Sequence, residues 1–147
     1  MNAIDTNVLV YSADNEEPEK QATAVALVNE VIGGSVPTVM MWQVATEFLS
    51  CLRRWERQGR ISRGDADLYL NRLLDVFELV CPTSDVIDIG VQLYQKYSLS
   101  HWDSMLIAAC VEAGVTTLYS EDMGHGATYD TVTVVNPFDS KDASQST

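Results

Sequence analysis

Four acidic residues stand at positions where their carboxylates could be brought together. Asp5 and Asp122 each follow a short apolar run that is typical of a buried strand. Glu47 lies beside the apolar stripe of one expected helix, and Asp103 lies in the first turn of another. Clustered carboxylates repel one another unless cations bind, and oxygen ligands of this kind select Mg²⁺ or Mn²⁺. Two such ions about 4 Å apart can activate a water and stabilise the leaving oxygen of a phosphodiester.

Each acid also has a simpler interpretation. Asp5 could cap the short helix that follows it, because Asp is favoured at helix N-caps. Glu47 could be a solvated helix residue, and Asp122 could be an ordinary loop acid. Asp103 could complete a capping box with Ser100 and favour the positive end of the helix dipole. For Asp103, capping and metal binding are compatible with each other.

The elements that position these acids alternate between short apolar runs and longer amphipathic segments. Strands are expected up to Asp5 and over residues 35–39, 77–81, 115–119 and 132–135. Helices are expected just after Asp5 and over residues 18–32, 44–58, 62–75, 84–97 and 102–113. This alternation predicts one α/β domain over residues 1–138, with a mostly parallel sheet of about five strands and helices on both faces.

The strand ends define where a ligand should bind. Ligands of parallel sheets gather at the carboxyl ends of the strands, at the switch point of the strand order. Asp5 and Asp122 therefore share one crevice if the first and fourth strands are neighbours. The last residues, 139–147, are polar and lack apolar periodicity, which predicts a disordered tail.

The charge of the chain argues at first against nucleic acid. The 147 residues contain 21 acidic and 9 basic side chains, a net charge of −12, whereas simple nucleic-acid binders are basic. The bases are concentrated, however. Five of the nine lie within eleven residues: Arg53, Arg54, Arg57, Arg60 and Arg63. The first three are candidate RNA contacts, because arginine suits phosphate, but basic residues also favour a helix C-terminus.

Several stretches, in order, resemble the PIN-domain ribonucleases. They are residues 5–11 (DTNVLVY), 45–48 (ATEF), 101–109 (HWDSMLIAA) and 118–123 (LYSEDM). The end of the chain, with His125-Gly126 and then VVNPF at 134–138, resembles the VapC toxin branch of that family. The resemblance covers nearly the whole chain and implies the three-layer PIN-like fold. Many relatives carry a further acid a few residues after the third acid of the set, and residues 105–110 here contain none.

The resemblance implies an endoribonuclease that depends on Mg²⁺ or Mn²⁺, with one or two ions per site. It also implies a toxin of a type II toxin–antitoxin system, usually a homodimer, neutralised by an antitoxin encoded beside it. By position, the metal-site acids are Asp5, Glu47, Asp103 and Asp122, and the supporting residues are Thr6, Asn7 and Ser120. The alternative is a non-toxin PIN-like protein that binds RNA or a partner without cleaving it.

The remaining expectations concern aromatic residues, thiols and location. Trp102 precedes Asp103 and is a candidate RNA contact, although packing in the core is the stronger expectation; Trp55 fits a core stripe. Cys51, Cys81 and Cys110 are expected to be buried, reduced thiols. The absence of a signal-peptide pattern and of a long apolar run predicts a cytoplasmic protein without a membrane span.

Overall fold

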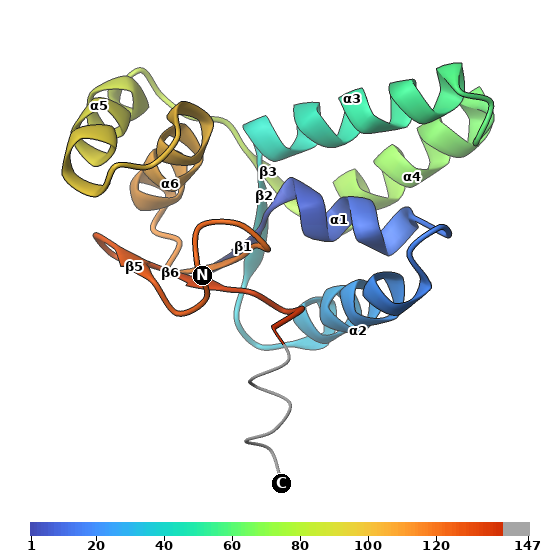
Figure 1. The fold of residues 1–147 in the computed structure, drawn as a ribbon, viewed down its shortest axis with the longest axis horizontal. Coiled ribbons are helices and arrows are strands. Elements are labelled where there is room, and N and C mark those ends of the chain that lie inside the picture. Colours follow the sequence, from blue (N-terminus) through green and yellow to red (C-terminus); the bar gives the residue numbers. More distant parts are fainter. Residues whose placement is uncertain (140–147) are drawn as a thin grey trace, which may run out of the picture.

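The computed structural model describes residues 1–139 and shows one sheet with helices on both faces (Figure 1). The strands are β1 (Asn2–Ile4), β2 (Thr38–Met41), β3 (Glu78–Val80), β4 (Thr117–Tyr119), β5 (Thr128–Tyr129) and β6 (Val132–Val135). The helices are α1 (Thr6–Ala13), α2 (Pro18–Gly33), α3 (Trp42–Arg57), α4 (Arg63–Val76), α5 (Asp85–Tyr97) and α6 (His101–Ala113). The predicted disordered tail lies, apart from Asp139, outside the described residues.

The strand order places the first and fourth strands side by side. The sheet runs β3-β2-β1-β4-β6-β5, and every pair is parallel except β5 with β6. The chain builds outward from β1 through β2 to β3 and then returns to the other side of β1. The strand order therefore reverses between β1 and β4, which is the predicted switch point.

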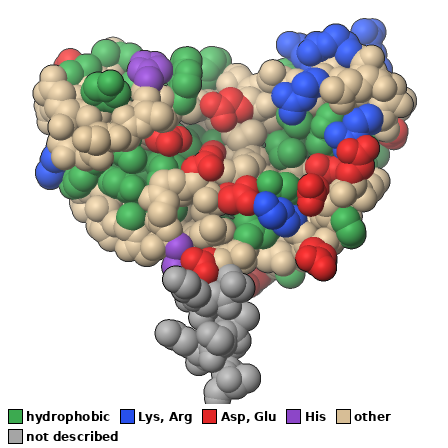
Figure 2. Space-filling model, viewed as in Figure 1, with side chains coloured by type: hydrophobic (Ala, Val, Ile, Leu, Met, Phe, Trp, Pro, Cys, Tyr) green, Lys and Arg blue, Asp and Glu red, His purple; other side chains and the backbone are tan. Residues whose placement is uncertain are grey.

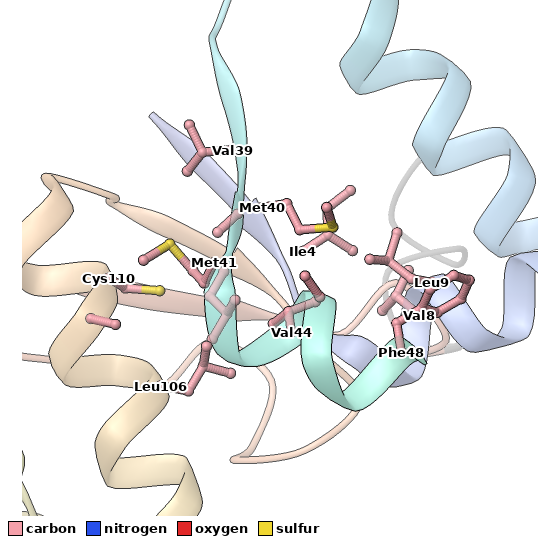
Figure 3. Close-up of a cluster of buried hydrophobic side chains, with 14 of the residues drawn as sticks. Ile4, Val8, Leu9, Val39, Met40, Met41, Val44, Phe48, Leu106 and Cys110 are labelled. Atoms are coloured by element: carbon pink, nitrogen blue, oxygen red, sulfur yellow. The ribbon is translucent and has the colours of Figure 1, made fainter. Parts of the chain in front are cut away.

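Two groups of helices cover the sheet. Helices α1 to α4 lie on one side and α5 with α6 on the other (Figure 1). Figure 3 shows Val8, Leu9, Val44 and Phe48 packed together where α1 and α3 meet the sheet; all four side chains are buried. This packing fixes the starts of α1 and α3, the two helices that carry Asp5 and Glu47 into the site.

The sheet differs from the prediction by one additional strand and in several strand boundaries, most of all at the start of β2. It has six strands, because residues 128–129 form a short antiparallel hairpin strand that is too brief to show periodicity in the sequence. β2 begins at Thr38 and not at residue 35. Pro37 has no N–H, and its carbonyl accepts a hydrogen bond from Asn2 N at the margin of the sheet (2.8 Å).

Two of the three cysteines are buried as predicted, and the third is not. Cys51 and Cys110 lie in the core, whereas Cys81 is exposed because it directly follows β3, the edge strand of the sheet. Trp55 is buried in the predicted α3 stripe. Within residues 1–139, no helix has the length and apolarity required to cross a membrane.

Candidate functional site: an acidic pocket at the strand ends

A cavity of about 450 Å³ opens where β1 and β4 end. All four predicted acids line it, together with both supporting residues of α1 and one arginine of α3: Asp5, Thr6, Asn7, Glu47, Arg54, Asp103 and Asp122. Figure 2 shows acidic side chains in the hollow between the lobe of α5 and α6 and the arm of α3 and α4. We refer to this cavity as the acidic pocket.

Asp5 is the most buried of the four acids, at 6% exposed. It caps α1, and its Oδ1 accepts a hydrogen bond from Thr6 N at 2.7 Å. Its Oδ2 accepts a second hydrogen bond from Ser120 Oγ, also at 2.7 Å. Burial raises the pKa of the Asp5 carboxyl to about 6, although both hydrogen bonds oppose that shift; the charges of Asp122 and Glu47 add to it. Asp5 therefore serves as a cap and lines the pocket at the same time.

Asp122 is held by α1 across the switch point. Asn7 Nδ2 donates to Asp122 Oδ2 at 3.1 Å, and Asn7 Oδ1 accepts from the backbone N–H of Glu121 at 3.3 Å. Ser120 Oγ also accepts from Asp122 N at 3.1 Å. Asn7 thus contacts the loop that carries Asp122, and Ser120 joins that loop to Asp5. Asn7 and Ser120, which were predicted as supporting residues, both contact this loop.

Glu47 enters the pocket from α3 and is oriented by two neighbours. Thr6 Oγ1 donates to Glu47 Oε2 at 2.7 Å, and Gln43 Nε2 donates to Glu47 Oε1 at 3.1 Å. Gln43 also reaches the backbone carbonyl of Trp102 on α6 at 3.3 Å. Gln43 was not predicted as a site residue, although its spacing of four residues from Glu47 on one helix could have indicated the contact.

Asp103 presents its carboxylate without using it as a cap. The hydroxyl of Ser100 accepts from Asp103 N at 3.2 Å, which supplies the N-cap of α6. Among residues 1–139, no group donates a hydrogen bond to the Asp103 carboxylate, which lines the acidic pocket. The backbone N–H of Asp103, and not its side chain, therefore makes the capping hydrogen bond with Ser100.

A cation that was not predicted as a site residue supports the loop after β4. Lys20 of α2 forms an ion pair with Glu121, donates to the Tyr11 hydroxyl at 3.1 Å, and lies 4.5 Å from the centre of the Tyr11 ring. These contacts raise the pKa of Lys20, chiefly through the hydrogen bond to Glu121. Glu121 adjoins Asp122, so two residues hold this loop. Lys20 holds it through the side chain of Glu121, and Asn7 holds it through the side chain of Asp122 and the backbone N–H of Glu121.

The predicted RNA contacts are not all equally close to the acids. Arg54 lines the acidic pocket, whereas Arg53 and Arg57 are exposed elsewhere on α3. Lys and Arg side chains gather over the far ends of α3 and α4 (Figure 2). Trp102 is 65% exposed, so the stronger expectation that it packs in the core is wrong. As the second residue of α6, it precedes the buried face that begins at Ser104.

The donors of the acidic pocket suit a hard divalent cation. All four candidate ligands are carboxylates, and within residues 1–139 no cationic side chain is among the groups that shift the pKa of the buried Asp5. Within the described part of the chain, no three His, Cys, Asp or Glu side chains are grouped closely enough to form a metal site by themselves. Mg²⁺ commonly takes one or two carboxylates and completes its shell with waters and substrate phosphates, so the donor set fits this ion.

The comparisons with known proteins agree with this fold. A family model described as the PIN domain matches residues 3–129. The chain is similar in structure to a toxin–antitoxin complex from Klebsiella pneumoniae, with a TM-score of 0.65 and 16% identity, over 94% of this chain and 98% of that chain. No curated protein sequence matches the chain.

Two further solved structures are similar. One is VapC20 from Mycobacterium tuberculosis, described as a sarcin–ricin loop cleaving toxin, with a TM-score of 0.63 and 17% identity over 83% of this chain and 90% of that chain. The other is VapBC2 from Rickettsia felis, bound to a DNA fragment from its promoter, with a TM-score of 0.65 and 10% identity over 90% of this chain and 96% of that chain. At these identities the likeness concerns the fold.

Proposed function

Because this chain belongs to the PIN domain family, we propose that it is an endoribonuclease that requires Mg²⁺ or Mn²⁺. The observation that carries the proposal is the meeting of four carboxylates from four separate elements around one pocket at the switch point. The capping of α1 by Asp5 does not require the other three carboxylates, so it does not account for the repulsion between Asp5, Glu47 and Asp122. Bound cations would offset this repulsion, so a metal-binding role explains why the carboxylates are grouped.

The chain's own residues would hold the cation and orient it. Asp5 and Asp122 are the ligands fixed on both sides of the switch point, and Glu47 and Asp103 approach from α3 and α6. The cation, when bound, supplies an activated water and neutralises charge at the phosphodiester. Ser120 and Thr6 set the direction of the Asp5 oxygens, while Asn7 sets that of Asp122.

The substrate strand would reach the pocket along α3. Arg54 lies at the pocket, and Arg53 and Arg57 continue the positive charge along the exposed side of the helix. Arginines there contact phosphates and position the backbone without reading its sequence. Trp102 stands exposed at the rim, where a base could stack. The acidic surface elsewhere would keep the strand on this path.

We also propose that the enzyme is the toxin of a type II toxin–antitoxin module and works in the cytoplasm as a homodimer. The support is the similarity in fold to the Klebsiella pneumoniae toxin–antitoxin complex and to VapBC2. An antitoxin segment that carries Arg or Lys could enter the acidic pocket, pair with the carboxylates and displace the metal. An open reading frame for a small protein beside this gene, whose product co-purifies with the chain, is expected.

The nuclease proposal is tested with purified protein and structured RNA in EDTA, Mg²⁺ or Mn²⁺. An RNA that contains a sarcin–ricin loop is a suitable first substrate, given the description of VapC20. We expect cleavage only with metal and a loss of at least ~100-fold in Asp5→Asn and Asp122→Asn. Asp67→Asn, which removes an exposed acid of α4, is the matched control. Cleavage that persists in Asp5→Asn or in EDTA contradicts the proposal and favours a PIN-like protein that binds without cutting.

A further inference from the structure

Gln43 of α3 connects the two groups of helices that border the acidic pocket. Its amide nitrogen donates to Glu47 Oε1 at 3.1 Å and to the backbone carbonyl of Trp102 at 3.3 Å. Within residues 1–139, the second contact is the only hydrogen bond between α3 and α6. Gln43 therefore joins the arm of α3 and α4 to the lobe of α5 and α6 at the hollow that Figure 2 shows.

The orientation of the Gln43 amide follows from the chemistry of its two partners. An ionised carboxylate and a peptide carbonyl accept hydrogen bonds and donate none. Both N–H groups of the amide are therefore directed to Glu47 and Trp102, which leaves the amide oxygen, Oε1, without either partner. No other group in the described part of the chain donates a hydrogen bond to this oxygen. Because Gln43 is only half-buried and lines the acidic pocket, its oxygen is available as an acceptor for a ligand.

We propose that Gln43 Oε1 accepts a hydrogen bond from a ribose 2′-hydroxyl of the substrate and thereby selects RNA over DNA. This inference rests on the proposed nuclease and assigns its preference for RNA to one residue. The phosphates and ring oxygens of a nucleic-acid backbone are acceptors, and within a strand the 2′-hydroxyl is the only donor of that backbone. DNA lacks this donor, so an acceptor held in place beside the metal ligands would stay unpaired against DNA.

The position of Gln43 favours the sugar over a base as its partner. Gln43 is hydrogen-bonded to Glu47, which is one of the proposed metal ligands. The phosphodiester has to reach the bound cation to be cleaved, so the sugars attached to that phosphate lie next to the carboxylates. The bases can extend away from the cation, towards the exposed ring of Trp102 at the rim of the pocket. An acceptor that contacts a metal ligand is therefore placed to meet a sugar.

An uncharged acceptor suits this position better than another carboxylate. The pocket already contains the carboxylates of Asp5, Glu47, Asp103 and Asp122. A fifth negative charge would add to the repulsion among them and would itself compete for the cation. An amide accepts a hydrogen bond without adding charge, and its N–H groups stabilise the ionised form of Glu47. Gln43 can therefore position a metal ligand and contact the substrate with the same side chain.

The binding of three matched oligonucleotides tests the inference separately from cleavage. The probes are octamers of uridine, 2′-fluorouridine and deoxyuridine, and their affinities are measured in Mg²⁺ with Asp5→Asn protein to prevent cleavage. The 2′-fluoro sugar keeps the conformation of ribose but has no O–H to donate. We expect the uridine octamer to bind more tightly than both analogues. Gln43→Met has a side chain of similar length without an amide, and it should reduce this preference ~5-fold, as expected for one neutral hydrogen bond.

Thr6→Val is the matched control, because Thr6 Oγ1 donates to the other oxygen of Glu47 at 2.7 Å. Thr6→Val and Gln43→Met each remove one donor from Glu47, so with Asp5 intact both should lower Mn²⁺ affinity in calorimetry. Thr6→Val retains the oxygen of Gln43, and we expect its preference for the uridine octamer to equal that of the parent protein. Circular dichroism verifies folding, and Gln43→Ala replaces Gln43→Met if that variant does not fold.

Three results would overturn the inference: an unchanged preference in Gln43→Met, an equal loss of preference in Thr6→Val, or no binding of any octamer. In the first case, a uniform loss of affinity for all three probes would assign the Gln43 oxygen to a base or to a water on the cation. A wild type that does not cleave RNA, but whose preference for uridine depends on Gln43, would instead contradict the nuclease proposal alone.

Discussion

The Asp5 carboxylate and the Ser120 hydroxyl are 115 positions apart in the chain and are joined by a hydrogen bond of 2.7 Å. This contact spans the two strands at the switch point, because Asp5 follows β1 and Ser120 follows β4. Ser120 is fully buried and also accepts from Asp122 N. One hydroxyl therefore links two of the proposed metal ligands.

Removal of that hydroxyl should alter the acidity of the site. In Ser120→Ala the ionised form of Asp5 loses a donor, so the pKa of Asp5 should rise further above its usual value. The midpoint pH for Mn²⁺ binding, measured by calorimetry, should move upward. Ser104→Ala is the matched control, because Ser104 is also a buried serine but its hydroxyl donates to the Ser100 carbonyl. An unchanged midpoint in Ser120→Ala would contradict the role assigned to Ser120.

The raised pKa of Asp5 predicts how stability depends on pH without metal. The carboxyl has a pKa of about 6 in the folded chain against an ordinary value of 3.8. The folded state therefore binds more protons between these values, and the free energy of unfolding falls as pH rises through this window. At pH 8 the accumulated loss is up to about 3 kcal/mol.

The Asp5→Asn variant isolates this effect. Asparagine does not ionise, so the variant should be more stable than the wild type at pH 8, and the advantage should disappear near pH 4. Urea unfolding in EDTA at both pH values measures the difference. Added Mn²⁺ should stabilise the wild type alone, because ligand binding to the folded state adds to its stability. A variant that is less stable than the wild type at pH 8 would contradict the raised pKa.

The ion pair between Lys20 and Glu121 should position Asp122. Lys20→Met and Glu121→Gln are each expected to lower Mn²⁺ affinity about threefold to tenfold, with a smaller effect on the cleavage rate at saturating metal. The double variant should equal the singles, because both remove one coupled contact. Arg63→Met breaks an exposed ion pair with Glu56 between α3 and α4 and should leave the affinity unchanged. Additive losses in the double variant would show that the two residues act separately.

Arg54 should contribute more to RNA binding than other arginines of the chain. Arg54→Ala is expected to weaken RNA binding and to reduce the slope of log affinity against log salt by ~0.7, as expected for one phosphate contact on a single strand. Arg72→Ala removes the same charge from an exposed site on α4 that does not line the pocket, and it should change the slope little. Filter binding with Asp5→Asn protein avoids cleavage during the measurement. Equal effects of the two substitutions would show only a general charge effect.

Local pattern accounts for the elements that the sequence predicted well. The spacing of Val44, Phe48 and Trp55 identified the buried stripe of α3, because a helix repeats every 3.6 residues whatever surrounds it. The sequence contains no such pattern for the two-residue strand β5 or for the exposure of Trp102. Hairpin pairing and the burial of a side chain near a helix start depend on neighbours that are distant in the sequence.

The sequence by itself determined that acids follow strand ends, that Ser100 caps a helix, and that arginines concentrate at the end of α3. Only the tertiary structure decided that β1 adjoins β4, which brings Asp5 to Ser120 and Asn7 to Asp122. It also decided that Gln43 of α3 contacts Trp102 of α6 beside the acidic pocket. The physical reason is that backbone propensity and periodicity are local, whereas strand order and side-chain convergence arise from contacts between segments far apart in the chain.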